Sequence, residues 1–176
     1  MNGSVEGREV KSRIAAFPPV ACADARVLIL GSMPGVASLR QGFYYAHPRN
    51  AFWRILADVY HAPLPETISD RIALAQAHGI ALWDVVESCE RQGSLDSAIK
   101  HVKINDFDQL FARCPDIQKI FFNGGTAARL FRRYAPEYLA GRDWAQLPST
   151  SPAHTLSYER KLAQWRQALT DDEQPL

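Results

Sequence analysis

Residues 26–35 read RVLILGSMPG, and the apolar run that begins this segment decides the fold. A short, continuous apolar run that ends at a glycine is typical of a strand buried on both faces. Three later segments have the same character: residues 80–86 (IALWDVV), 118–125 (QKIFFNGG) and the shorter 144–147 (WAQL). Apolar residues at helical spacing predict helices between and after these strands, over residues 52–59, 65–78, 106–114, 126–139 and 157–170. Alternating strands and helices predict an α/β fold, a three-layer α/β/α sandwich whose central, mainly parallel sheet has about four strands.

Length and composition predict one packed domain over residues 1–176. Of the 176 residues, 47% are hydrophobic and 22% are charged, which excludes a disordered chain. We expect an N-terminal arm over residues 1–24 and a tail over residues 171–176 that frays. No apolar run reaches the roughly 18 residues that a membrane span needs, and the N-terminus lacks the apolar core of a signal peptide.

The three cysteines, Cys22, Cys89 and Cys114, are scattered along the chain. Their number and spacing argue against a disulfide framework and against a CxxC-type metal cluster. We therefore expect a reducing compartment, the cytoplasm, and no metal.

Functional residues in a parallel sheet of this kind gather in the loops that leave the carboxyl ends of the strands. Those loops are the long irregular segment 32–49, the segment that begins at Asp84, the turn 123–125 and the segment 149–155. We expect residues 87–105 to form a polar loop, and the Asn123–Gly125 turn to be structural.

The first motif is GSMPGVASLRQGFYYAHPRNAFW, residues 31–53. Gly31 and Gly35 permit a tight backbone, and Pro34 stiffens the turn. The aromatic residues 43–45 lie in a loop that we expect to face solvent, just before a polar helix start at residues 47–50. Exposed aromatics beside a helix N-terminus suit a flat ring ligand next to a phosphate. An ordinary glycine–proline turn is the alternative.

The second motif is LPSTSPAHTL, residues 147–156. It combines two prolines and three hydroxyl residues with His154, directly before the last helix. A plain turn with a surface histidine is the alternative interpretation. Because both motifs follow strands at the same end of the sheet, we expect them to form two halves of one cleft.

The two motifs together resemble the uracil-DNA glycosylase superfamily, and within it the hypoxanthine-DNA (deoxyinosine) glycosylases, from Arg26 to about Leu169. The resemblance implies a monofunctional enzyme of base excision repair that uses no metal or cofactor. Such an enzyme flips a deaminated base, hypoxanthine before uracil, out of DNA and hydrolyses its N-glycosidic bond. The implied partner is DNA that contains deaminated bases, with no membrane, and the implied state is a monomer.

The sequence departs from the family pattern in both motifs. Met33 stands where mismatch-specific relatives have an asparagine that holds the attacking water, and a thioether does not replace that hydrogen bond. Ser149, Thr150 and Ser151 stand where many relatives have His-Pro-Ser. In the hypoxanthine branch the asparagine at the position of Asn50 is implicated in catalysis, and here it is present, although helix capping alone would also explain it.

The resemblance and the chemistry of the side chains give a set of candidate residues. Asn50 and His154 are the catalytic candidates, since an amide can orient water or donate to the base, and an imidazole can protonate the base or contact a phosphate. The base-binding candidates are Gly31, Ser32, Met33, Pro34, Gly35, Tyr44, Asp84 and Ser151. Asp84 would accept the N1–H of hypoxanthine, or the N3–H of uracil, unless it only binds backbone N–H groups in its own loop.

The DNA-binding candidates are Arg40, Arg49, Ser149 and Leu156. Leu156 is either a wedge that fills the gap left by the flipped base or a core leucine. A net charge of +1 means that binding to DNA depends on local patches. The first such patch is Arg40, Arg49 and Arg54, and the second is Lys100 and Lys103.

Three other functions stay open at this point. A uracil- or mismatch-directed glycosylase keeps the fold and changes the base. A non-catalytic protein that binds damaged bases would explain the loss of both water-holding positions. A small-molecule binder of the doubly wound type is disfavoured because the first strand is not followed by GxGxxG. The absence of lysine from both motifs argues against a Schiff-base lyase step.

Overall fold

The computed structural model describes residues 13–171 of the chain. Residues 1–12 of the expected arm and residues 172–176 of the expected tail lie outside the described residues.

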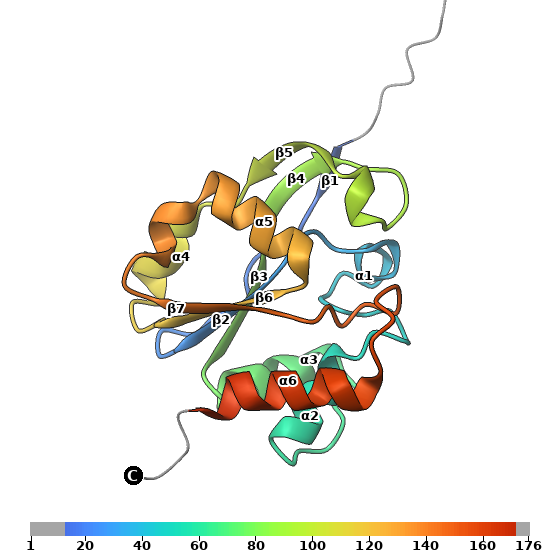
Figure 1. Cartoon of the computed structure of the whole chain (residues 1–176), viewed down its shortest axis with the longest axis vertical. Helices are drawn as coiled ribbons and strands as arrows, with labels where there is room; N and C mark the ends of the chain where they lie inside the picture. Colours follow the sequence, from blue (N-terminus) through green and yellow to red (C-terminus); the bar gives the residue numbers. More distant parts are fainter. Residues whose placement is uncertain (1–12, 172–176) are drawn as a thin grey trace, which may run out of the picture.

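The central sheet has four strands, all parallel, in the order β3-β2-β6-β7 (Figure 1). The strands are β2 (Val27–Gly31), β3 (Ile80–Asp84), β6 (Lys119–Asn123) and β7 (Asp143–Leu147). All residues of β3 are buried, as are four of the five residues of β2, as expected for strands covered on both faces. The predicted α/β/α sandwich with four parallel strands is therefore confirmed.

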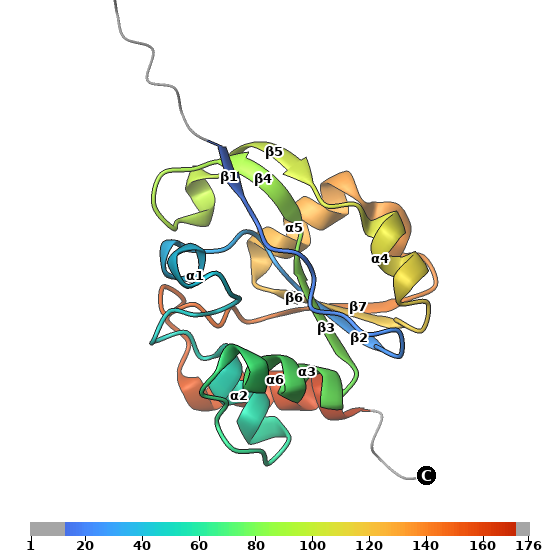
Figure 2. The ribbon, with the colours of Figure 1, turned by 180° about the vertical axis from the view of Figure 1, so that it is seen from behind.

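Helices cover both faces of this sheet, as Figures 1 and 2 show from opposite sides. One layer contains α4 (Phe107–Arg113) and α5 (Gly125–Tyr134), followed by the short 3-10 helix η2 (Pro136–Leu139). The other layer contains α2 (Phe52–Val59), α3 (Ile68–Ala77) and α6 (Tyr158–Thr170). The largest buried side chains of the second layer, Phe52 and Trp165, meet edge to face with ring centroids 5.9 Å apart.

The prediction of a polar loop over residues 87–105 was wrong. This segment contains β4 (Val86–Glu90), the 3-10 helix η1 (Asp96–Ala98) and β5 (Lys100–Ile104). With β1 (Arg13–Ala15) the two strands form an antiparallel sheet in the order β1-β4-β5. The expected arm thus contributes a strand, and further along it Val20 pairs with Leu82 at the edge of β3.

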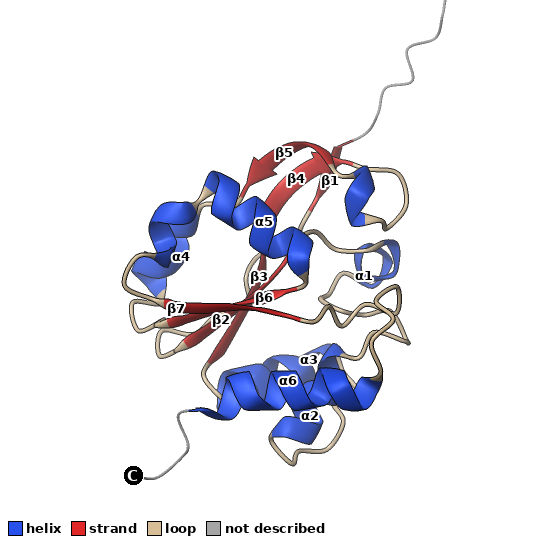
Figure 3. Cartoon of the chain, viewed as in Figure 1, coloured by secondary structure: helices blue, strands red, loops and turns tan. Residues whose placement is uncertain are grey.

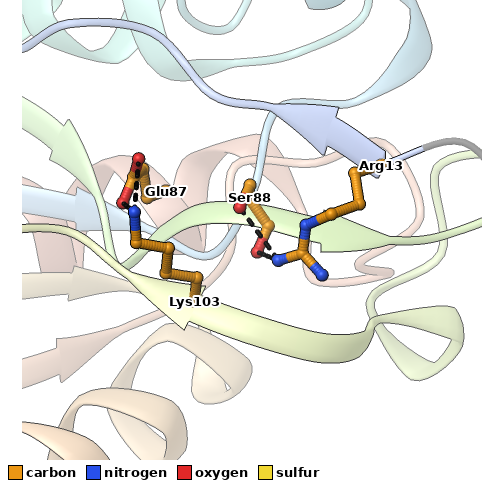
Figure 4. Close-up of polar contacts among 4 residues, drawn as sticks. All are labelled: Arg13, Glu87, Ser88 and Lys103. Carbon is orange, nitrogen blue, oxygen red and sulfur yellow. Dashed lines mark hydrogen bonds and ion pairs between the residues drawn. The ribbon is translucent and has the colours of Figure 1, made fainter.

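Charged side chains that made this segment look like a loop pair with one another across the strands. The Lys103 ammonium lies 2.9 Å from a Glu87 carboxylate oxygen, and Arg13 donates to Ser88 Oγ over 2.9 Å (Figure 4). Opposite charges on neighbouring strands are a normal stabilising pattern on the exposed face of a sheet. Val86 and Cys89 are buried in the core, so β4 is packed against the rest of the protein at these two positions.

One loop prediction and one helix prediction also need correction (Figure 3). The segment 32–49 is not wholly irregular, because α1 (Val36–Gln41) forms within it and ends at Gly42, whose φ of 72° suits a glycine. The helix predicted from Pro65 begins at Ile68 instead. Thr67 and Asp70 form a capping box at its start, and this reciprocal pair fixes the N-terminus better than the proline does.

Candidate functional site

The two sequence motifs meet at the carboxyl end of the central sheet. The backbone N–H of Ala51 donates to the carbonyl of Thr150 over 3.0 Å, which joins the first motif to the second. Thr150 is also held by Asn123 at the end of β6: Asn123 Nδ2 donates to Thr150 Oγ1, and the Thr150 N–H donates to Asn123 Oδ1, both over 2.9 Å. The structural role expected for the Asn123 turn is thus a clamp on the second motif.

A cleft of about 480 Å³ opens between the end of the first motif, the α2–α3 connection and the second motif. Its size is in the ordinary range for ligand sites. The basic and titratable side chains that line it are His47, Arg49, Arg54, Arg71, His154 and Lys161. No aspartate or glutamate lines the cleft within the part of the chain that the structure describes. A protein with a net charge of only +1 has therefore concentrated positive charge at one concave surface.

Asn50 lies in the wall of this cleft, two residues before α2, whose N-cap is Ala51 and not Asn50 as the sequence suggested. Its Oδ1 accepts the backbone N–H of Phe52 over 3.0 Å. The backbone N–H of Phe52 can only donate, so its partner must be the oxygen of the Asn50 amide. This contact fixes the orientation of that amide. The structure assigns no hydrogen bond within residues 13–171 to Nδ2, which leaves a donor at the cleft. Capping and a chemical role are therefore compatible in one side chain.

His154 also lines the cleft, in a turn whose backbone is held by hydrogen bonds. The His154 N–H donates to the Ser151 carbonyl over 3.0 Å. The Lys161 ammonium on α6 donates to the carbonyls of Ser151 and His154, over 3.2 and 2.9 Å. Although neither motif contains a lysine, the tertiary structure thus brings one to the cleft. The two carbonyls hold its amino group in place, while burial lowers the pKa of Lys161.

Tyr45 connects the cleft to the buried inner part of the site. Its ring lines the cleft and stacks on Phe52, with centroids 4.2 Å apart. Its backbone φ is +52°, which is uncommon for an aromatic residue. Its hydroxyl is buried without a hydrogen-bond partner among residues 13–171. Burial together with the Asp84 charge raises the pKa of this phenol, and the nearby Asn123 opposes the shift. A strained backbone and an unpaired hydroxyl at one residue are features of functional positions.

The inner part of the site is formed by Gly31 and Asp84 at the ends of two adjacent strands. A Cβ atom at Gly31 would lie 2.5 Å from Asp84 Oδ1 and 3.1 Å from the Tyr45 hydroxyl, so a larger residue would have to displace the Asp84 carboxyl. Asp84 is 3% exposed, and its Oδ2 has no hydrogen-bond partner within the described chain. Burial and the nearby Asp96 raise the pKa of Asp84 to about 7, while Arg91 opposes the shift.

The first motif is more deeply buried than expected, because residues 91–98 cover it. Ser32 Oγ donates to Asp96 Oδ1 over 2.7 Å, and Arg91 donates to the Pro34 carbonyl. The Val36 N–H donates to Ser94 Oγ over 2.8 Å. Ser32, Met33 and Pro34 are accordingly buried, whereas Gly35 is half-buried.

The expectation that the aromatic residues 43–45 face solvent was wrong. Phe43 is 7% and Tyr44 is 3% exposed, and Tyr45 is half-buried. The Tyr44 hydroxyl donates to the Pro18 carbonyl over 2.7 Å. These rings are needed to fill the space beneath the arm, where they form edge-to-face contacts with one another and with Phe17. Tyr44 thus lies in the core, and its neighbour Tyr45 reaches the cleft.

The candidate DNA contacts divide into two groups. Arg49 and Leu156 line the cleft, and so does Arg54, whose guanidinium lies 3.8 Å from the centroid of the Tyr158 ring. Arg40 is exposed on α1, outside the cleft lining. Ser149 packs against Gly124 and accepts the N–H of the half-buried Ser151 over 3.2 Å, so both serines shape the loop.

Sequence reasoning did not identify Tyr45, Thr150, Arg71 or Lys161 as site residues. Only Tyr45 had a usable signal, since it is the last aromatic before the HPRN segment. Arg71 belongs to α3, well beyond the first motif in sequence, and Lys161 lies in the first turn of α6, five residues after the second motif. Among residues 13–171, no three side chains of His, Cys, Asp or Glu are placed to share a metal ion. No helix in the same range is long and apolar enough to span a membrane.

Comparison with known proteins identifies this arrangement. The model of the Uracil DNA glycosylase superfamily matches residues 18–172. A "Hypoxanthine DNA glycosylase" of Methanosarcina barkeri (strain Fusaro / DSM 804) is 34% identical over 154 residues, which cover 86% of this chain and 95% of the relative. A protein of the same name from Methanosarcina acetivorans is 34% identical over 151 residues, 85% of this chain and 93% of the relative.

A solved structure agrees with the sequence relatives. The solution NMR structure of a Methanosarcina acetivorans protein assigned as a uracil DNA glycosylase superposes with a TM-score of 0.79 at 30% identity. The match covers 93% of this chain and all of that one. The chain therefore belongs to the uracil DNA glycosylase superfamily, as the two motifs predicted.

Proposed function

We propose that this protein is a monofunctional DNA glycosylase of base excision repair that removes hypoxanthine from DNA. The observation that carries the proposal is the cleft itself, which both Asn50 and His154 line, among cations and without carboxylates in the described chain. Both curated relatives described above carry the name of a hypoxanthine DNA glycosylase, which supports the choice of base.

The DNA strand is attracted by the cations of the cleft, and the target nucleotide rotates out of the duplex into it. Arg49 and Arg54 lie where they can contact phosphates, and the half-buried Leu156 at the rim can fill the gap in the base stack. The ring of Tyr45 offers a stacking surface for the flipped base. Its hydroxyl and Asp84 Oδ2, which have no partner among residues 13–171, are polar atoms that suit the polar edge of a base.

Hypoxanthine presents an O6 acceptor and an N1–H donor next to each other. An ionised Asp84 accepts the N1–H, and the Tyr45 hydroxyl donates to O6. Adenine presents the reverse pattern, so its N1 acceptor would face a carboxylate. This difference explains how the site would distinguish the deaminated base from the normal one.

Cleavage of the glycosidic bond develops positive charge on the sugar and negative charge on the departing base. Water adds to C1′ of the sugar, and a proton passes to the base, so the products are the free base and an abasic sugar. Asn50 donates from Nδ2 to the departing base, since its Oδ1 is occupied by the helix start. His154 donates to the base or to an adjacent phosphate. One well-placed donor contributes on the order of 10²–10³ in rate by stabilising charge in the transition state.

We also propose that one chain acts as a monomer, as a single domain over residues 1–176, in the cytoplasm. Every group named in the mechanism comes from one chain, and the three cysteines are free, which fits a reducing compartment.

The test is a cleavage assay on matched duplexes that each contain one hypoxanthine, uracil, xanthine or mismatched thymine. We expect strand breaks at hypoxanthine, and only after alkali, because a monofunctional enzyme leaves an intact abasic site. Asn50→Ala should lose about two to three orders of magnitude in rate. Asn50→Ser keeps an oxygen that can cap the helix but has no amide donor, so it should fold like the wild type and lose the same activity.

Other outcomes would reject parts of the proposal. Faster cleavage at uracil would reject the base preference, and strand breaks without alkali would reject a monofunctional reaction. Binding of the modified duplexes without cleavage would make the protein a damaged-base binder.

A further inference from the structure

Lys161 is the most deeply buried cation of the cleft. It lies in the first turn of α6, lines the cleft and is only 4% exposed. Its Nζ makes the two hydrogen bonds to the carbonyls of Ser151 and His154 described above. An ammonium group carries three N–H donors, so one donor remains after these two bonds.

The positive charge of Lys161 has no carboxylate partner in the described chain. The ion pairs of residues 13–171 are His101–Glu90 and Lys103–Glu87, both on the antiparallel sheet. Burial lowers the pKa of Lys161, and no neighbouring acid counteracts this effect. Burying an ammonium without an opposite charge costs free energy, and the two carbonyls offset only part of that cost.

Holding the turn of the second motif does not require a positive charge at residue 161. A neutral amide could donate the same two hydrogen bonds to the carbonyls of Ser151 and His154. The positive charge of Lys161 is better explained by an anionic group of the substrate that pairs with it. The cleft suits an anion, because its basic lining includes Arg49, Arg54 and Arg71 and its described part contains no acid. In DNA that anion is the phosphodiester group, whose non-bridging oxygens accept hydrogen bonds from ammonium groups.

We propose that Lys161 binds a phosphodiester group of the DNA strand from which the base is excised. The third N–H of its ammonium group donates to a non-bridging oxygen of that phosphate. The inference rests on the proposed function. It adds a phosphate subsite beneath the second motif, and it gives Lys161 two tasks. One is to hold the turn that carries His154, and the other is to fix the strand in register with that turn.

The test compares DNA binding by three variants as a function of salt. The probe is a duplex with a tetrahydrofuran abasic site, which the enzyme cannot cleave. Lys161→Gln keeps donors for the carbonyls and removes the charge, and Lys161→Arg keeps the charge. Arg160→Gln removes one exposed charge from the same helix, outside the cleft, and is the matched control. Thermal unfolding of each variant reports whether the fold is intact.

Loss of one phosphate contact lowers the slope of log Kd against log salt concentration by about 0.9. We expect this decrease in Lys161→Gln, a slope like that of the wild type in Lys161→Arg, and little change in Arg160→Gln. A wild-type slope in folded Lys161→Gln would mean that Lys161 only holds the turn. An equal decrease in Arg160→Gln would mean that the effect is one of general charge. Either result overturns the proposal.

A second measurement on the wild-type protein covers the case in which Lys161→Gln does not fold. The ¹⁵Nζ resonance of Lys161, assigned by its loss in Lys161→Arg, should shift when the abasic duplex is added. The shift should change when a single phosphate beside the abasic site is replaced with a phosphorothioate. A resonance that DNA does not move would refute the contact.

Neither measurement depends on cleavage, so the two proposals fail separately. Cleavage at hypoxanthine with an unchanged slope in Lys161→Gln would reject only the phosphate subsite. A reduced slope without cleavage at any base would reject only the glycosylase activity.

Discussion

Replacing Asp84 with asparagine should make the stability of this protein less dependent on pH. The pKa of the buried Asp84 carboxyl is raised from 3.8 to about 7 in the folded protein. Between these two values the folded protein holds a proton that the unfolded chain has released. The free energy of unfolding therefore falls as the pH rises through this range, and the stabilising proton is lost above about pH 7.

The size of the effect follows from the shift in pKa. One pKa unit corresponds to about 1.4 kcal/mol, so the full shift of roughly three units costs about 4 kcal/mol at high pH. From pH 5 to pH 8 the Asp84 contribution to the free energy of unfolding changes by about 2 to 3 kcal/mol. Asparagine does not titrate. From pH 5 to pH 8 the free energy of unfolding of Asp84→Asn, relative to that of the wild type, should therefore rise by about 2 to 3 kcal/mol.

The assay is urea unfolding at pH 5 and pH 8, followed by the fluorescence of the four tryptophans. The comparison of two pH values removes any constant effect of the amide, such as an unpaired N–H. Asp116→Asn, which changes an exposed aspartate, is the control and should keep the wild-type pH dependence. If Asp84→Asn and the wild type lose stability in parallel between the two pH values, the buried carboxyl is not the cause and the reasoning is refuted.

Three further substitutions test other contacts of the site and fold. Asn123→Ala removes both hydrogen bonds to Thr150 and leaves buried polar atoms unpaired. Urea unfolding should show that the free energy of unfolding falls by about 1–3 kcal/mol. The excision rate should also fall, even at saturating DNA. A wild-type rate would show that the clamp is not needed for activity. Thr67→Ala breaks the capping box of α3 and should cost about 1 kcal/mol in stability with no change in excision, and a loss of activity would contradict this separation. Gly31→Ala places a methyl group against the Asp84 carboxyl and should abolish excision of hypoxanthine in the oligonucleotide assay. An active variant would show that Asp84 can move aside.

The resemblance of two short motifs was sufficient to identify the superfamily, because those motifs are local in sequence. Asn50, Arg49, His154 and Leu156 were all named from the motifs, and all four line the cleft. What each of these residues does there stays a prediction until the assays are done.

The errors in the sequence-based predictions have a common physical cause. Residues 87–105 looked like a loop because they are polar and contain Gly93 and several charges, yet Glu87 and Lys103 form an ion pair across two strands. The aromatic residues 43–45 were expected on the surface because their loop follows a strand end. The arm folds back over them, and Pro18 accepts the Tyr44 hydroxyl. In both cases a distant segment determined which residues are buried.

The sequence determines the four parallel strands, the helices that cover them and the end of the sheet at which the site lies. Hydrophobic periodicity and glycine placement are local properties, and burial on both faces of a strand leaves a continuous apolar run. The strand order, the clamp of Asn123 on Thr150 and the arrival of Lys161 and Arg71 at the cleft were decided only by the tertiary structure. The raised pKa of Asp84 belongs with these features, because desolvation and Coulomb interactions depend on distances in space between residues that are far apart along the chain.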